Sequence, residues 1–141
     1  MNVEKIRQRI ERRYDERLTA LENRRTTLLQ KLRDGLPDFT NEFPDVTKLI
    51  VFGSLVHPGY FTEISDVDIA VTNLPNLRYW DALLWLEKCL EFENIDLVRI
   101  EEARPGILKF IALGLVLHEE KGNRSFFYHS LVADLPARAR D

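Results

Sequence analysis

Residues 49–71, LIVFGSLVHPGYFTEISDVDIAV, contain two apolar runs, a Gly-Ser pair and two aspartates one residue apart. The first run predicts a buried strand over Lys48–Phe52 that ends at Gly53, and the alternation in SDVDIAVT predicts a second strand. Residues i and i+2 of a strand point to the same face, so Asp66 and Asp68 should present two carboxylates side by side. Because like charges this close repel, we expect a compensating positive charge.

A divalent cation and a polyphosphate together meet this requirement. Mg²⁺ binds carboxylate oxygens and completes its shell with water or phosphate oxygens. The Gly53-Ser54 turn, where a helix should open, offers backbone N–H groups and a hydroxyl to an anion. A third acid, Asp96, begins a predicted strand in NIDLVRI and could lie alongside the pair. These residues indicate a site for a nucleoside triphosphate, with metal between the acids and the phosphates.

The N-terminal segment predicts a long charged helix. Apolar residues recur every three or four positions from Val3 to about Arg33 and make one narrow stripe. Gly35 and Pro37 should stop this helix, since glycine favours a C-terminal cap and proline cannot continue a helix. Such an apolar stripe requires a surface to pack against. Its own sheet is the first expectation, and docking or dimerisation through this helix is the alternative.

The remaining pattern predicts one α/β or α+β domain, with helices packed on a mixed sheet. A helix is expected over residues 77–91. Another helix should run from Pro105 through Ala112, and LVLHE should form a small final strand. The apolar face expected on the helix over residues 77–91 consists of Leu77, Trp80, Leu83, Leu84 and Leu90.

Composition limits the class of protein. The 141 residues, 45% hydrophobic and 30% charged, suit one ordinary globular domain. The single cysteine, Cys89, excludes an internal disulfide framework and is consistent with the cytoplasm. The longest apolar run, residues 110–117, is shorter than the roughly 18 residues of a membrane span. Residues 1–34 hold ten basic and six acidic residues, which favours a solvated helix face over a nucleic-acid surface.

The motifs resemble those of the DNA polymerase beta-like nucleotidyltransferase superfamily. The small size resembles its minimal nucleotidyltransferase (MNT) branch, the antitoxins that pair with HEPN-domain toxins. The resemblance, which runs from about Lys48 to Glu120, implies a polymerase-beta-like fold. We therefore expect a nucleotidyltransferase domain (37–121), with an N-terminal helical extension (1–36) and a C-terminal tail (122–141) that lie outside the resemblance. The motifs that carry it are Gly53-Ser54, Ser65-Asp66-Val67-Asp68 and Ile95-Asp96-Leu97-Val98.

The resemblance also implies a reaction and a role for each residue. Asp66 and Asp68 would bind two Mg²⁺ ions, and Asp96 would bind the one next to the attacking hydroxyl. Gly53 and Ser54 would hold the triphosphate of ATP. The hydroxyl would attack the α-phosphate in line while pyrophosphate leaves. In the antitoxin branch the acceptor is a tyrosine of the toxin, which is silenced when AMP is attached.

Two further residues accompany these motifs. By the resemblance, Ser65 would support the turn before Asp66. Residues 55–60, LVHPGY, stand where the family often has an arginine-bearing stretch. His57 is therefore either a substitute for that arginine or a surface loop residue, and the second reading is favoured.

Three other functions stay open. A small-molecule nucleotidyltransferase would need a second domain to hold its substrate, and only 45 residues follow Asp96, which favours an acceptor on a partner protein. A binding module could neutralise a toxin by covering it, although such a module would not need all three acids. A ribonuclease is suggested by Arg124 and His129, which are spaced as in the HEPN toxins' own motif, but those toxins are all-helical.

Overall fold

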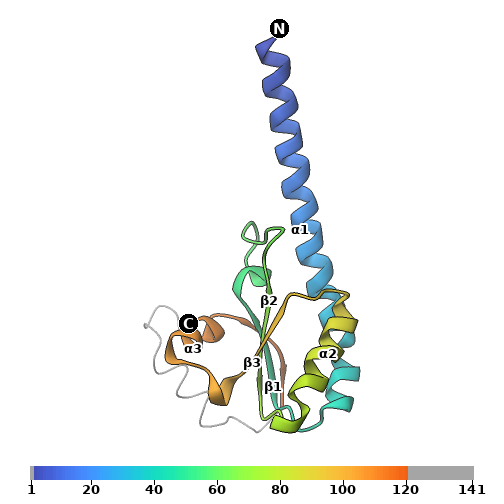
Figure 1. Ribbon diagram of the computed structural model, residues 1–141, viewed down its shortest axis with the longest axis vertical. Helices are drawn as coiled ribbons and strands as arrows, with labels where there is room; N and C mark the ends of the chain where they lie inside the picture. Colours follow the sequence, from blue (N-terminus) through green and yellow to red (C-terminus); the bar gives the residue numbers. More distant parts are fainter. Residues whose placement is uncertain (1, 121–141) are drawn as a thin grey trace.

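The computed structural model describes residues 2–120, and within this range it contains a four-stranded sheet in the order β3-β2-β1-β4 (Figure 1). The central strand β1 pairs antiparallel with β2 and β4, while β2 and β3 are parallel, so the sheet is mixed, as predicted. Arg124, His129 and the predicted tail lie outside the described residues. The strands are β1 (Lys48–Phe52), β2 (Val67–Thr72), β3 (Ile95–Arg99) and β4 (Leu115–Glu119).

Helices cover both faces of this sheet. Leu32 of α1 and Leu86 of α2 join one buried cluster with Val51 and Ile69 of the sheet. Ile111 of α3 joins a smaller cluster on the other face. This arrangement confirms the predicted class, a mixed sheet flanked by helices with a long N-terminal helix. The helices are α1 (Val3–Glu42), α2 (Tyr79–Leu90) and α3 (Pro105–Ala112), with 3₁₀ turns η1 (Gly53–Val56), η2 (Asn76–Arg78) and η3 (Ile100–Glu102).

The predicted end of α1 is wrong, because the helix continues through Gly35 and Pro37 to Glu42. Proline lacks an N–H and forfeits one helical hydrogen bond. In return, the extra turns allow Phe39 and Phe43 to be buried; they are 1% and 2% exposed, and their tilted rings lie 4.9 Å apart between centroids. Burying two such rings stabilises the fold by about 2 kcal/mol each, enough to offset one lost bond.

Gly35 is not a helix cap but a point of close contact between α1 and α2. A Cβ at this position would lie 2.5 Å from Sγ of Cys89 and 3.3 Å from the ring of Trp85. The partly buried Cys89 therefore has a packing role, as predicted. A side chain larger than hydrogen at residue 35 would require Cys89 to shift and would disturb the contact between the two helices.

We therefore expect Gly35→Ala to destabilise the fold by about 1–3 kcal/mol, even though alanine favours helix by about 1 kcal/mol. Chemical denaturation of the single and double variants measures the effect. In a Cys89→Ala background, where the nearest atom is removed, the same substitution should cost much less. An equal cost in both backgrounds would contradict this packing account.

The expected face of α2 is largely wrong. Leu77, Trp80 and Leu84 are 96%, 69% and 53% exposed. The helix begins only at Tyr79, whose hydroxyl donates to the carbonyl of Leu97 at 2.7 Å and so fixes how α2 sits against β3. Of the five residues expected on this face, Leu90 is buried and Leu83 packs partly against the core. The fully buried residues of α2 are Ala82, Leu86 and Leu90.

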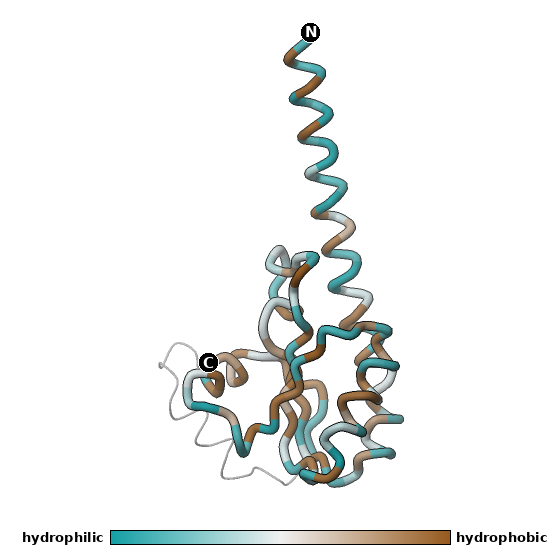
Figure 2. Tube along the Cα trace, viewed as in Figure 1, coloured by the Kyte–Doolittle hydropathy of each residue, from teal (hydrophilic) through white to brown (hydrophobic). Residues whose placement is uncertain are grey.

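Residues 3–21 of α1, here called the arm, extend away from the domain (Figure 2). The expectation that the stripe packs on its own sheet holds only for its lower part, where Leu28 and Leu32 are buried. In the arm, the stripe residues Val3, Ile10 and Tyr14 are 76%, 60% and 58% exposed. None of the helices within residues 2–120 combines the length and apolar character of a membrane span.

Candidate active site

Three chain segments meet at one edge of the sheet. Since β1 runs antiparallel to β2 and β2 runs parallel to β3, the end of β1 and the beginnings of β2 and β3 lie together. In the register, Asp68 lies between Phe52 on one side and Asp96 on the other. The sheet thus brings two of the three predicted acids side by side, next to the Gly53-Ser54 turn that follows β1.

Gly53 fits tightly against the middle acid of this edge. Its φ of +74° lies in the left-handed region that side chains disfavour, and a Cβ there would overlap the carboxylate of Asp68. Gly53 begins the 3₁₀ turn η1, which takes the place of the expected helix. This position therefore requires glycine for two reasons, its backbone angle and its contact with Asp68.

Asp68 is held in an electrostatically unfavourable place. Burial, and then the negative charges of Asp96 and Asp66, raise the pKa of its carboxyl from 3.8 to about 6. Asp66 and Asp96 are themselves exposed to solvent. A bound cation would remove the penalty on charged Asp68, so the donor set has the chemistry of a site for a hard cation.

As they are placed here, Asp66, Asp68 and Asp96 do not form a complete metal-binding group. Asp66 lies one residue before β2 and so falls outside the regular strand that holds Asp68. In the described part of the chain, no three His, Cys, Asp or Glu side chains are arranged to hold a metal ion together. The structure thus pairs Asp68 with Asp96 and leaves Asp66 nearby, at the end of the preceding loop.

That loop, residues 57–66, has its own internal contacts. The hydroxyl of Ser65 accepts a hydrogen bond from the backbone N–H of Thr62 at 2.8 Å and so braces the turn before Asp66. His57 is exposed, and its ring lies 6.1 Å from that of Tyr60 between centroids. This position agrees with the surface reading of His57 rather than with a contact to phosphate.

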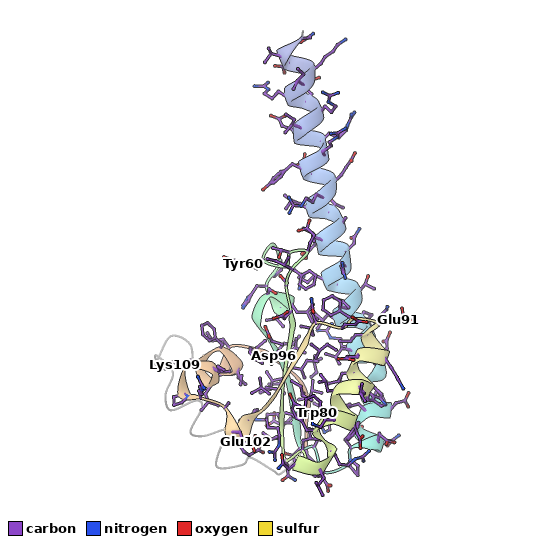
Figure 3. All side chains as sticks on the ribbon, in the orientation of Figure 1. Tyr60, Trp80, Glu91, Asp96, Glu102 and Lys109 are labelled. Atoms are coloured by element: carbon purple, nitrogen blue, oxygen red, sulfur yellow. The ribbon has the colours of Figure 1, made fainter. Side chains whose placement is uncertain are left out.

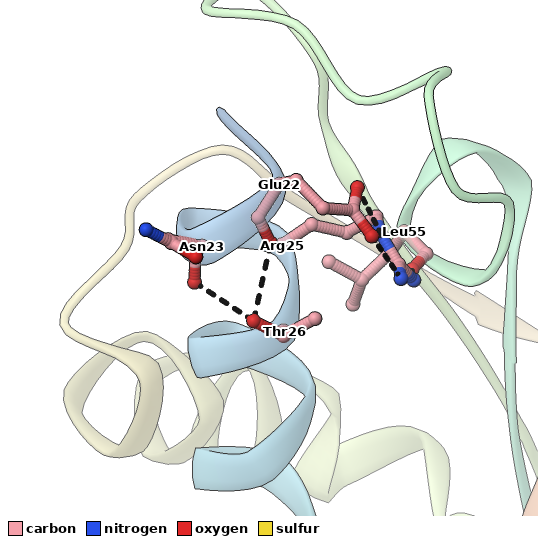
Figure 4. A network of polar contacts seen from close by, with 5 residues as sticks. All are labelled: Glu22, Asn23, Arg25, Thr26 and Leu55. Carbon is pink, nitrogen blue, oxygen red and sulfur yellow. Dashed lines mark hydrogen bonds and ion pairs between the residues drawn. The ribbon is translucent and has the colours of Figure 1, made fainter. Parts of the chain in front are cut away.

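The sequence interpretation missed a buried arginine that holds the Gly-Ser turn in place. Arg25 of α1 is only 7% exposed and donates to the carbonyl of Leu55 at 2.7 Å (Figure 4). Glu22 pairs with the same guanidinium at 2.6 Å, and this hydrogen bond lowers the pKa of Glu22. Leu55 follows Ser54 directly, so α1 positions the turn. The one signal in the sequence was an arginine within the apolar stripe.

A second ion pair connects α1 with the loop before Asp66. Arg17 donates to both carboxylate oxygens of Glu63, at 2.5 and 2.9 Å. Its guanidinium lowers the pKa of Glu63 from 4.5 to about 2. Both side chains are about half exposed, so the pair contributes little to stability. Its importance is geometric, because it places the base of the arm beside the loop that leads to Asp66.

A family model described as "Polymerase beta, Nucleotidyltransferase" matches residues 35–123 of the chain. No curated protein matches this chain.

Solved structures of toxin–antitoxin complexes resemble the fold. A double Asp-to-Glu mutant of MntA-HpeT matches with TM-score 0.59 and 20% identity, covering 72% of this chain and 84% of that one. A complex with AMP-PNP gives 0.58 and 22%, with the same coverage. A tri-AMPylated Shewanella oneidensis HEPN toxin with MNT antitoxin gives 0.54 and 20%, covering 74% and 83%. These likenesses confirm the predicted fold.

Proposed function

Because the chain belongs to the polymerase beta nucleotidyltransferase family, we propose that it transfers AMP from ATP to a hydroxyl of a partner protein. The partner is a HEPN-domain toxin, the acceptor is a tyrosine, and the modification neutralises the toxin. The chain would then be an antitoxin that acts in the cytoplasm. The observation that carries this proposal is the pairing of Asp68 with Asp96 beside Gly53, at the sheet edge where β1 ends.

Each residue of this edge has a role in the proposal. Gly53 and Ser54 would bind the triphosphate through the turn that Arg25 holds from behind. Asp96, exposed at the beginning of β3, would orient the acceptor hydroxyl, and Asp68 would face the α-phosphate. Asp96 is exposed to solvent, which suits a side chain brought in by another protein. The structural neighbours, which include complexes with AMP-PNP and with an AMPylated toxin, support this reading.

We propose that two Mg²⁺ ions complete this donor set, because carboxylates are hard ligands and the charge of Asp68 is uncompensated. Asp66, Asp68 and Asp96 would hold them, with Asp66 drawn in from the loop. When bound, the ions would stabilise charge on the attacking and departing oxygens. The residues of this chain would fix the geometry in which the hydroxyl, the phosphate and the leaving pyrophosphate lie in line.

Intact-mass spectrometry of the protein encoded by the neighbouring gene tests this proposal. After incubation with the wild-type chain, ATP and MgCl₂, its mass should rise by one or more AMP units. Asp96→Asn should abolish the increase, because a hydroxyl without this carboxylate is poorly oriented. Asp45→Asn, a matched change at an exposed aspartate before β1, should leave it intact.

Other outcomes of the same experiment separate the alternatives. An unchanged mass with every nucleotide, together with neutralisation of the toxin by the wild type and by Asp96→Asn alike, would favour the non-catalytic binding module. Transfer to an added small hydroxyl compound, but not to protein, would favour the small-molecule nucleotidyltransferase.

A further inference from the structure

The apolar stripe of α1 continues past the domain without a cover. In its lower part the stripe is buried at Leu28 and Leu32, and in the arm the same side of the helix exposes Ile10 and Tyr14. Within a protein, a helix gains most of its stability from packing an amphipathic face. An exposed continuation of a buried stripe therefore indicates a surface that another molecule covers.

This surface reaches the candidate active site. Arg17 fastens the arm to Glu63, which belongs to the loop between Ser54 and Asp66. The same loop exposes two large apolar side chains, Tyr60 at 73% and Ile64 at 87%. Figure 3 shows Tyr60 near the base of the arm, on the side of the domain from which the arm projects, and Asp96 farther from the arm. A molecule seated on the stripe would therefore abut the loop that leads to the acids.

A row of basic residues follows one side of the stripe. Lys5, Arg9 and Arg13 recur at intervals of four, each directly before an apolar residue of the stripe, so they form a ridge parallel to it. Within residues 2–120, none of the three has an ion-pair partner, in contrast to Arg7, which pairs with Glu4. The charge complementary to this ridge is a row of carboxylates.

We infer that the arm and the loop around Tyr60 form the docking surface for the acceptor protein, and that this partner contributes a helix whose apolar stripe is flanked by carboxylates. The inference rests on the proposed function, since it names the surface that brings the acceptor hydroxyl to the site. A second copy of the chain that pairs antiparallel through the arms is disfavoured. In an antiparallel pair of arms, the row containing Arg9 would face the same row of its copy, and like charges would repel.

The test compares two double variants with equal changes in charge. Ile10→Asp with Tyr14→Asp places carboxylates in the stripe, while Gln8→Asp with Thr19→Asp places them on the opposite, exposed face of the arm. The probe is the protein of the neighbouring gene, titrated by calorimetry against each full-length variant. The stripe variant should bind at least about tenfold more weakly, and the control should bind like the wild type. Circular dichroism should find equal helicity in both.

A charge-reversal variant tests the basic row separately. Arg9→Glu with Arg13→Glu should weaken binding of the same protein and make its affinity less dependent on salt. Binding of ATP with Mg²⁺ to the isolated chain should be unchanged in all arm variants, because the arm does not touch the nucleotide. Equal partner affinity and equal salt dependence in the wild type and in both arm variants would overturn the docking surface while leaving the proposed function intact.

Other outcomes are equally decisive. If the wild type binds the partner through the stripe but never modifies it, the docking surface stands and the proposed transfer fails. If light scattering finds the wild-type chain to be a dimer and the stripe variant a monomer, the arm is covered by a second copy and the inference is wrong.

Discussion

Replacing Asp68 with asparagine should abolish nucleotidyl transfer and, at the same time, make the folded protein more stable at neutral pH. The two effects have one cause. Asp68 lies half-buried between the charges of Asp96 and Asp66, which is unfavourable for folding but suits the binding of a cation. Asparagine keeps the shape of the side chain and removes its charge. A residue with a purely structural role would lose stability on the same substitution.

The pH dependence gives the sign of this effect. The pKa of Asp68 is raised to about 6 in the folded protein, against 3.8 in the unfolded chain. Its contribution to stability is therefore fully present below about pH 4 and is lost as the pH rises through about 6. The full shift would correspond to about 3 kcal/mol, and because the group is half exposed we expect about 1 kcal/mol.

Urea denaturation at pH 4 and at pH 7.5 measures this difference. Asp68→Asn should be more stable than the wild type by about 1 kcal/mol at pH 7.5, with a smaller gap at pH 4. Asp45→Asn serves as the matched control and should have a small effect at both values. A loss of stability in Asp68→Asn at pH 7.5, or full transfer activity in this variant, would contradict the account of the site.

Gly53→Ala should produce the second large effect, a loss of transfer activity of about a hundredfold or more together with lower stability. The methyl group would overlap the Asp68 carboxylate, which must then leave its position beside the turn. The left-handed backbone angle adds about 1 kcal/mol of strain, and the displacement adds about 1–3 kcal/mol more.

Gly59 offers a close control for this substitution. Its φ of +87° is also in the left-handed region, but a Cβ there would meet nothing within 4 Å. Gly59→Ala should therefore have only the strain cost of about 1 kcal/mol and keep near-normal transfer. Steady-state kinetics and denaturation of both variants measure the contrast. Equal losses of activity would mean that the contact between Gly53 and Asp68 has no special role.

Local patterns were sufficient to predict the strands of a mixed sheet and to suggest that Asp96 could lie alongside the other acids. The apolar run of β1 and the alternation in β2 leave few other structures for these residues, and Asp68 and Asp96 each stand second in a parallel strand. The short helix after Pro105 was also predicted at its observed ends. Such features depend on neighbours in the sequence, which a pattern can capture.

Features decided by long-range packing could not be predicted. Gly35 and Pro37 are local stop signals, yet α1 continues because Phe39 and Phe43 find a buried place that only the folded domain provides. Helix α2 carries apolar residues on two faces. The hydrogen bond from Tyr79 to the carbonyl of Leu97 in β3 fixes which of these faces packs against the sheet. Arg25 is distant in sequence from the turn that it positions, so no motif could reveal it.

The central claim is that the three aspartates gather around divalent cations opposite the Gly53-Ser54 turn. A crystal structure with Mn²⁺ and a non-hydrolysable ATP analogue, recorded at a wavelength where manganese scatters anomalously, tests it most directly. We expect manganese peaks about 2.1 Å from carboxylate oxygens of Asp66, Asp68 and Asp96, with the terminal phosphates on the turn. Peaks elsewhere, or an Asp96 side chain turned away from the metals, would contradict the claim.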